Sequence, residues 1–484
     1  MPIRSAVSGL ARAASTVVVV GMLLPGSGRA LLRAQYPDVP PPPPCKPSGR
    51  DGGASPATGR ANADDADDAA RLALLPFQSL SVDDPAAARF AYALSQRVAE
   101  RIRDMRPVEA TSRTVMGSVD PSATSDIKAV GSALRARYVL AGTIARTERG
   151  MLVTVRLLRG RDGSVAWQSR FERATAALPA LEAEIARAVA TRAFDGDLAK
   201  RGNAGSALTA NGEAYRHFLQ AESYFAERTP QSLGQAVAQY DTATTLDPRF
   251  ATAWSRLALA YAVQAESGAG SAAADSQLVK RGLGAADRAA TVDPASSDAW
   301  VARAMLLERQ NPRAFPAVRA AFERAIRLDP RNAEAHRRYG RALMVRGETT
   351  AADRELRAAL DLEPDLGGAL VARAEMSFYA GRYGDACYLL NAAITADYRF
   401  ADAYALRARA RLPLREVRYA YADAEVASRL GNVVAGDAMG VVVAAAARDT
   451  VSARTRAKRL LQSPLVAGRR PLAVKVAHPV ALAL

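Results

Sequence analysis

The sequence has few cysteines and histidines for its length. There are two cysteines and three histidines in 484 residues. Cys45 and Cys387 are too few for a disulfide framework or a cysteine metal site, and we expect Cys387 to be a small residue of a helical core. His217, His336 and His478 lie far apart, and none has a partner at metal-ligand spacing. The sequence therefore predicts no metal site.

Catalytic motifs are also missing. There is no Walker-type phosphate loop, no glycine-rich dinucleotide fingerprint and no Gly-x-Ser-x-Gly elbow. Glu182 and Glu184 are close in sequence, but they lie on different sides of a predicted helix, where we expect them to keep that helix soluble. The sequence therefore predicts no catalytic residue and no cofactor, which favours a protein that is not an enzyme.

Lysine is scarce although the chain is strongly basic. The net charge of +16 and the isoelectric point near 10.2 are typical of proteins that bind nucleic acid or an anionic membrane. Arginine supplies nearly all of this charge and is spread along the chain. Only 454–459, extending to Arg469 and Arg470, forms a focused basic patch, which we interpret as a solvated helix face rather than a nucleic-acid site. Lysine occurs only at Lys46, Lys128, Lys200, Lys280, Lys458 and Lys475.

Long apolar runs are absent except near the amino terminus. Two arginines precede the apolar run 13–24, and a proline, glycines and small residues follow it. This order is that of a secretory signal, and the run is shorter than the roughly 20 apolar residues that span a bilayer. We predict a signal peptide over 1–34 with cleavage near Ala30 or Ala34; an uncleaved anchor is the alternative. The protein is then exported, and periplasmic or membrane-associated.

Two segments have compositions that cannot bury a core. Five prolines at 40–44 precede a Gly/Ala/Asp-rich stretch, and we predict that 35–69 is a disordered tether. The last segment, 463–484, has no periodicity and is predicted to be disordered as well. A linker over 196–212 separates two regions whose periodicities differ.

The first of these regions, 70–195, alternates predicted strands and helices. A hairpin is indicated by Arg161-Asp162-Gly163 between two apolar runs. Leu181, Ile185 and Val189 form one stripe of the closing helix, and Phe90, Leu94, Val98, Ile102 and Met105 form one face of an earlier helix. An α+β domain is expected. Its predicted strands cover 72–77, 108–113, 137–145, 152–158 and 164–171. A further helix covers 126–136, and the closing helix covers 178–193.

A set of residues spread over this region carries a family resemblance. They are Leu74, Leu75, Pro76, Phe77, Ser112, Arg113, Arg137, Tyr138, Val139, Leu140, Gly142, Gly163, Trp167, Glu184, Ile185 and Ala186. With these residues, the region resembles the TolB amino-terminal-like domain that precedes repeat arrays in many exported bacterial proteins. The sequence departs from the family at Ala141, where an acidic residue is usual. The resemblance implies a binding or scaffolding module at the cell envelope, and it implies no catalytic residue.

The second region repeats itself at the period of a two-helix solenoid. Leu328-Asp329-Pro330 recurs as Leu362-Glu363-Pro364 and, eroded, as Ala396-Asp397-Tyr398, each about 34 residues after the last. Small residues, such as Gly340 and Ala352, stand where two helices would touch. These residues, with Trp254 and Trp300 at equivalent places, resemble the tetratricopeptide repeat (TPR) family. The predicted units are 213–248, 249–294, 295–330, 331–364, 365–398 and 399–432, an expanded turn lies at 267–276, and a capping helix pair ends the array at 462.

Similarity to TPR proteins implies a superhelix whose first helices line a concave binding groove. Outward-facing residues there are the candidate contacts; a solvated charged face is the alternative. The sequence thus predicts a non-catalytic scaffold of the bacterial envelope that binds a protein or peptide. A sensory or regulatory subunit whose TolB-like domain binds a small ligand is the alternative, and an envelope hydrolase is a weaker one. The candidate groove residues are Arg337, Arg341, Glu375, Phe378, Tyr379 and Arg409.

Overall fold

The computed structural model describes most of the two folded regions. The predicted signal peptide, the strand predicted at 108–113, the carboxy-terminal tail and all of the tether except Cys45 lie outside the described residues. The described residues are Cys45, 72–81, 84–105, 127–133, 136–148, 150–174, 177–193, 208–267, 272–397, 400–430, 433–446 and 449–462.

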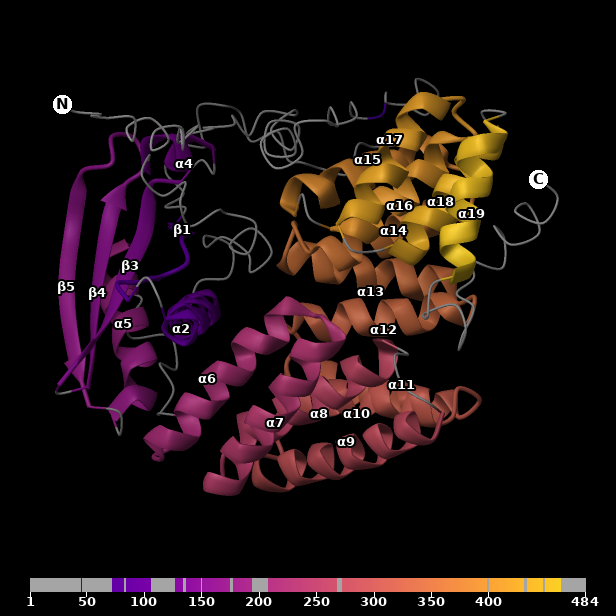
Figure 1. The fold of residues 1–484 in the computed structure, drawn as a ribbon. Helices are drawn as coiled ribbons and strands as arrows, with labels where there is room; N and C mark the ends of the chain where they lie inside the picture. The colour runs from indigo at the N-terminus through magenta and orange to yellow at the C-terminus, as the bar shows by residue number, and fades with distance from the viewer. Residues whose placement is uncertain are drawn as a thin grey trace, which may run out of the picture.

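The amino-terminal part contains a twisted mixed sheet (Figure 1). Its order is β1-β3-β4-β5, with β2 also beside β3. β1 and β2 run parallel to β3, while β3, β4 and β5 form an antiparallel meander. The turn between β4 and β5 contains Gly163 with φ of +74°, so the predicted hairpin is confirmed. The strands are β1 (Leu72–Leu74), β2 (Gln78–Ser79), β3 (Tyr138–Thr147), β4 (Gly150–Arg159) and β5 (Val165–Arg173).

Helices pack on both faces of this sheet. α2 (Pro85–Met105) and α5 (Leu178–Ala193) cover one face, and the shorter α4 (Ile127–Ala133) packs on the other (Figure 1). Successive side chains of β3 point to opposite faces of the sheet and so belong to two different cores. Leu140 lies in the core under α2 and α5, and Val139 lies in the core under α4. The stripes predicted for the two longer helices are confirmed at Phe90, Leu94, Val98, Ile102, Leu181, Ile185 and Val189, all buried.

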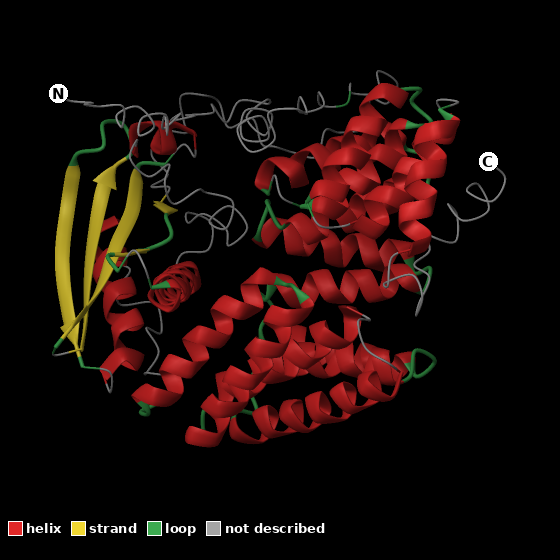
Figure 2. Cartoon of the chain, in the orientation of Figure 1, coloured by secondary structure: helices red, strands yellow, loops and turns green. Residues whose placement is uncertain are grey.

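The described residues from Gly212 onward are mainly helical and form a TPR solenoid (Figure 2). Successive antiparallel pairs correspond to the six predicted units, followed by one further pair. The pairs are α6 (Gly212–Glu227) with α7 (Pro230–Leu246), α8 (Ala251–Ser267) with α9 (Ala272–Val292), α10 (Ser297–Gln310) with α11 (Phe315–Leu328), α12 (Ala333–Val345) with α13 (Thr349–Leu362), α14 (Gly367–Tyr379) with α15 (Tyr383–Ala396), α16 (Ala401–Arg411) with α17 (Val417–Arg429), and α18 (Val433–Ala446) with α19 (Thr450–Gln462). The fold is therefore an α+β domain followed by an all-α superhelix.

Close contact between the two helices of a repeat depends on small residues, as expected. A Cβ atom on Gly340 of α12 would lie 2.7 Å from the Leu356 side chain and 3.1 Å from the Ala352 carbonyl oxygen of α13. The predicted expanded turn at 267–276 is wrong in part, since α9 already begins at Ala272. Alanine is the strongest helix former, and the run of alanines there extends the helix toward α8.

The two regions share one hydrophobic core. α6 of the first repeat packs against α2 and α5, so that α2 lies between the sheet and the array (Figure 1). The main cluster of buried apolar residues runs without a break from Leu72 on β1 to Ala352 on α13. The position of the α+β domain on the array is therefore fixed by packing.

Candidate functional site

The first helices of the repeats line the inner side of the superhelix. From α8 to α18, the first helix of each repeat contacts the first helix of the next repeat. The second helices of neighbouring repeats make no comparable mutual contact among the described residues. Helices that lie closer together must be on the inside of the curve, so the concave surface consists of first helices, as the repeat resemblance implied.

Three of the predicted groove residues occupy equivalent positions on successive first helices. Arg341 lies on α12, Glu375 on α14 and Arg409 on α16, and they recur at the 34-residue period. The side chains of Arg341 and Glu375 make no hydrogen bond or ion pair with any residue that the structure describes. Neither charge is therefore committed to an ion pair within the described chain.

Two other predicted residues form an aromatic cluster that holds Arg409. The Arg409 guanidinium carbon lies 4.3 Å from the ring centroid of Phe378 and 5.3 Å from that of Tyr379. Phe378 also packs edge-on against Tyr383, with ring centroids 5.3 Å apart. Tyr379 is 58% exposed although it is aromatic. The structure thus brings Phe378, Tyr379 and Arg409 together as a preorganised patch on α14 and α16.

Arg337 is less suited to a ligand than the sequence suggested. Its Nε and Nη2 atoms donate to Glu334 one turn away, at 2.6 and 2.5 Å, and its side chain packs against Gly368 of the next first helix. Burial raises the pKa of Glu334, but the attraction of Arg337 and Arg338 outweighs it and lowers that pKa well below its usual range. Arg337 is consequently committed to the repeat itself.

Other arginines of the inner helices are internal to the fold. On α16, Arg407 donates to both carboxylate oxygens of Asp423 on α17, at 2.9 and 2.6 Å, and Arg411 lies 2.9 Å from the same carboxylate. All three side chains are almost completely buried. Arg456, within the basic patch predicted to be solvated, is also buried and pairs with Glu425. Arginine content therefore overstates the charge that the surface presents.

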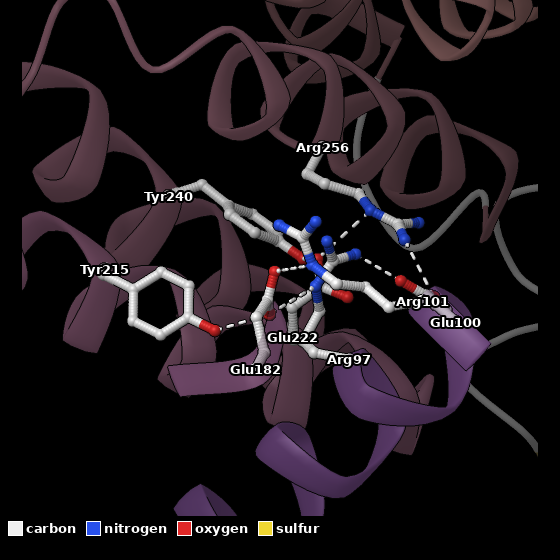
Figure 3. A network of polar contacts seen from close by, with 8 residues as sticks. All are labelled: Arg97, Glu100, Arg101, Glu182, Tyr215, Glu222, Tyr240 and Arg256. Carbon is white, nitrogen blue, oxygen red and sulfur yellow. Dashed lines mark hydrogen bonds and ion pairs between the residues drawn. The ribbon is translucent and has the colours of Figure 1, made fainter. Parts of the chain in front are cut away.

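A buried polar network joins the α+β domain to the first repeats (Figure 3). Glu182 on α5 is at its centre and is fully buried. It accepts from Arg101 Nε at 2.7 Å and from the Tyr215 hydroxyl of α6 at 2.5 Å, and Arg97 Nε lies 3.4 Å away. Burial, followed by the nearby Glu182 charge, raises the pKa of Tyr215, which keeps the hydroxyl protonated as a donor.

The network continues into the second repeat. Glu100 of α2 bonds with Arg97 and lies 3.3 Å from Arg256 of α8, while Arg256 Nε lies 3.2 Å from Glu222 of α6. Tyr240 of α7 donates to the same Glu222 at 2.6 Å. Burial disfavours the charge of Arg256, but Glu222 and Glu100 outweigh it, and its pKa is raised. Side chains from α2, α5, α6, α7 and α8 are thus held in one cluster.

The prediction that Glu182 is a solvated residue is therefore wrong. Glu184, two residues later, does lie at the surface, where it pairs with Arg173. A sequence signal for Glu182 did exist. It lies three residues before Ile185 and seven before Val189, so it shares their buried stripe, and a buried carboxylate needs cationic partners from elsewhere in the fold.

The two cysteines are paired, a single bond that the expectation of no disulfide framework had left out. Cys45 and Cys387 are joined by a disulfide with a Cα–Cα separation of 5.8 Å, and Cys387 is fully buried in α15. The bond links residues 342 positions apart and joins Cys45, which precedes the sheet in the sequence, to the fifth repeat. A count of two cysteines carries no information on proximity, so only the fold reveals the pair.

A cavity lies among the described residues of the α+β domain. It has a volume of about 260 Å³ and lies beside the outer part of β3 and β4. Its wall includes Gln78, Ala141, Thr143, Arg156 and Gly163. Among the described residues that line the cavity, Arg156 is the charged one, and its side chain is exposed. The cavity is slightly smaller than the common range of small-molecule sites, which starts at about 300 Å³.

Comparison with known proteins gives a family match for a minor part of the chain. The model of the FlgO protein family matches residues 78–172, within the α+β domain. No curated protein matches the chain. The TolB-like resemblance therefore stays a prediction.

Solved structures similar to the chain are distant. PilF of Pseudomonas aeruginosa is 17% identical with a TM-score of 0.38, over 47% of this chain and 96% of its own. PilW, a type IV pilus biogenesis factor, is 19% identical with a TM-score of 0.36, over 44% and 96%. A TPR protein of Thermus thermophilus is 18% identical with a TM-score of 0.33, over 39% and 100%. These values are too low for any inference about function.

Proposed function

We propose that this protein is a non-catalytic scaffold that binds a protein or peptide on the concave surface of its TPR array. The observation that carries the proposal is the patch on α14 and α16. Tyr379 is largely exposed there, Arg409 is held over Phe378 and Tyr379, and the Glu375 side chain has no hydrogen bond or ion pair within the described chain. Aromatic and arginine side chains are the residue types that dominate protein interfaces.

We propose different roles for the TPR array and for the α+β domain. Residues 213–462 form the binding array and residues 70–195 form a rigid α+β domain at its start. The buried network around Glu182 supports this, because it fixes the domain on the first two repeats. The domain then acts as a cap that covers the apolar face of α6, which a terminal repeat would otherwise expose.

The proposed location is the bacterial cell envelope, either periplasmic or membrane-associated. The amino-terminal order of basic, apolar and small residues supports export. The Cys45–Cys387 disulfide is a second and independent support, since such bonds persist in oxidising compartments and are rare in the cytosol. None of the helices in the described part of the chain is long and apolar enough to span a membrane.

A matched pair of tyrosines tests the proposal. Tyr379 lies on a first helix and is 58% exposed, whereas Tyr388 lies on the adjacent second helix and is 46% exposed. Wild-type protein and the variants Tyr379→Ala and Tyr388→Ala are used to purify partners after crosslinking in cells. We expect a partner that is retained by wild type and Tyr388→Ala and lost by Tyr379→Ala. Equal recovery with all three proteins contradicts binding on the concave surface.

A sensory subunit is the second candidate, because of the cavity beside β3 and β4. In that case a small ligand occupies the cavity and the rigid contact between α2, α5 and α6 relays its presence to the repeats. Hydrogen exchange with and without a low-molecular-mass envelope extract tests this role. Protection confined to 138–159 favours it, and unchanged exchange over those strands argues against it.

A further inference from the structure

The inner surface carries two rows of side chains in register with the repeats. The first row is Arg341, Glu375 and Arg409, so its charges alternate along three first helices. The second row lies about one helical turn further along and is uncharged. It consists of Val345 at the end of α12, Tyr379 at the end of α14 and Pro413 in the turn two residues after α16, all exposed. The rows are parallel because both follow the period of the repeat.

The spacing of these rows selects one kind of peptide conformation. Packed helices lie about 8–10 Å apart, and a segment that crosses the first helices meets one charge at each step. A polyproline II helix advances about 9.3 Å in one turn of three residues, so side chains three residues apart share one face at this same interval. In a fully extended strand, side chains three residues apart point to opposite faces.

We propose that the groove binds a polyproline II segment with the charge order acidic, basic, acidic at every third residue. This rests on the proposed function and adds the chemistry of the partner. Arg341 and Arg409 pair with the two acidic side chains, and Glu375 pairs with the basic one between them. Tyr379 lies beside the central position, where its exposed ring packs against the prolines of the segment.

The neighbouring charges are consistent with this order. Burial and then the Glu266 charge raise the pKa of Glu308 on α10. The charges of Arg346, Arg341 and Arg338 act in the opposite direction and lower it. Arg341 therefore acts electrostatically on Glu308 of the preceding first helix, although Glu308 lies 33 residues before it and outside the row. Arg409 is held by its aromatic neighbours and by the Tyr379 hydroxyl at 3.5 Å, so its position is set before the partner arrives.

Two fluorescent peptides of identical composition test the charge order. The first contains Glu-Pro-Pro-Lys-Pro-Pro-Glu and the second contains Lys-Pro-Pro-Glu-Pro-Pro-Glu, so net charge and proline content are matched. The first order is symmetric, and it fits the row whichever way the peptide runs. We expect the first peptide to bind the full-length protein roughly tenfold more tightly by fluorescence anisotropy at low salt, because two pairs become repulsive in the second. The difference shrinks as salt is raised.

Two protein variants control for general electrostatics. The row is inverted in Arg341→Glu/Glu375→Arg/Arg409→Glu, and three exposed second-helix charges are inverted in Arg324→Glu/Arg354→Glu/Asp385→Arg, with the same change in net charge. Urea unfolding confirms that both remain folded. The preference for the first peptide should reverse in the row variant, because the inverted row repels all three charges of the first peptide and attracts two of the second. The preference should persist in the second-helix variant.

The possible results separate this inference from the proposed function. Equal binding of the two peptides, with loss of both in Tyr379→Ala, overturns the charge order and leaves the concave site in place. A preference that survives inversion of the row also overturns it. Absence of binding by either peptide overturns the polyproline II partner, while the comparison of Tyr379→Ala with Tyr388→Ala continues to test the scaffold by itself.

Discussion

The hydroxyl of Tyr215 donates a hydrogen bond to Oε2 of Glu182 at 2.5 Å, and this bond joins the two regions of the protein. Both residues are fully buried. Glu182 lies on α5, the last helix of the α+β domain, and Tyr215 lies on α6, the first helix of the array. Because the same carboxylate also accepts from Arg101, a cation of α2 and a phenol of the first repeat are held by one acidic group.

Loss of the Glu182 charge should destabilise the whole protein. In Glu182→Gln, Arg97 and Arg101 keep their buried charges without the carboxylate, which costs about 3–5 kcal/mol. Glu184→Gln is the matched control, since its ion pair with Arg173 is partly exposed and contributes less than about 1 kcal/mol. Urea unfolding measures both. Similar losses in the two variants would contradict the central position of Glu182.

Alanine should have opposite effects at two helical glycines. Gly340→Ala places a methyl group 2.7 Å from Leu356, and such overpacking costs about 1–3 kcal/mol. Gly284→Ala on α9 meets no described atom within 4 Å, so it should gain about 0.5–1 kcal/mol from the lower backbone entropy of the unfolded chain. Thermal unfolding distinguishes the two. A Gly340→Ala variant as stable as Gly284→Ala would refute close packing of α12 on α13.

The disulfide should stabilise the protein only under oxidising conditions. Disulfides typically contribute about 2–4 kcal/mol by restricting the unfolded chain. Cys45→Ser removes the bond while leaving the buried Cys387 unchanged. We expect wild type to be more stable than Cys45→Ser without reductant and equally stable with it. Alkylation of the denatured chain provides a direct readout, and two reactive thiols in unreduced wild type would disprove the bond.

The pair formed by His336 and Glu355 should make stability depend on pH. Nδ1 of His336 lies 2.8 Å from a Glu355 carboxylate oxygen. The hydrogen bond with Glu355 raises the pKa of His336, and the same bond lowers the pKa of Glu355. The interaction that raises the pKa of His336 stabilises the folded protein fully below the ordinary histidine pKa of about 6.5. This stabilisation is lost as pH rises through the pKa of His336 in the folded protein. The interaction that lowers the pKa of Glu355 stabilises the folded protein fully above the ordinary glutamate pKa of about 4.3. This stabilisation is lost as pH falls through the pKa of Glu355 in the folded protein.

The pair therefore stabilises most between those two ordinary pKa values. The difference in unfolding free energy between wild type and Glu355→Gln should be larger near about pH 5.5 than near about pH 8.5. An NMR titration of His336 provides the control, because its pKa should fall in the variant. A stability difference that grows toward alkaline pH would contradict the assigned direction.

The sequence predicts the repeats well because their signals are local and periodic. The 34-residue recurrence of Pro330 and Pro364 and the small residues Gly340 and Ala352 each follow from the packing of a single helix pair. The hairpin at Gly163 is likewise a local signal. Each of these features depends on residues that are close together in the chain, so no knowledge of the tertiary fold is needed.

The long-range contacts could not be predicted in the same way. Glu182 bonds with Tyr215 across a linker, and Cys45 bonds with Cys387 across most of the chain. Their partners depend on how separate elements pack. Arg337 illustrates the reverse case, since its helical position predicted an accessible side chain and its neighbour Glu334 binds it instead. The identity of the groove residues that contact a partner stays a prediction.

Site-specific photocrosslinking tests the central claim most directly. A photoreactive phenylalanine analogue replaces Tyr379 on the inner surface in one protein and Tyr388 on the outer surface in another, both exposed tyrosines of the fifth repeat. After irradiation in cells, mass spectrometry identifies the attached segment. The account predicts one recurrent polypeptide segment crosslinked from position 379 and not from position 388. The same segment from both positions, or none from position 379, would contradict binding on the concave surface.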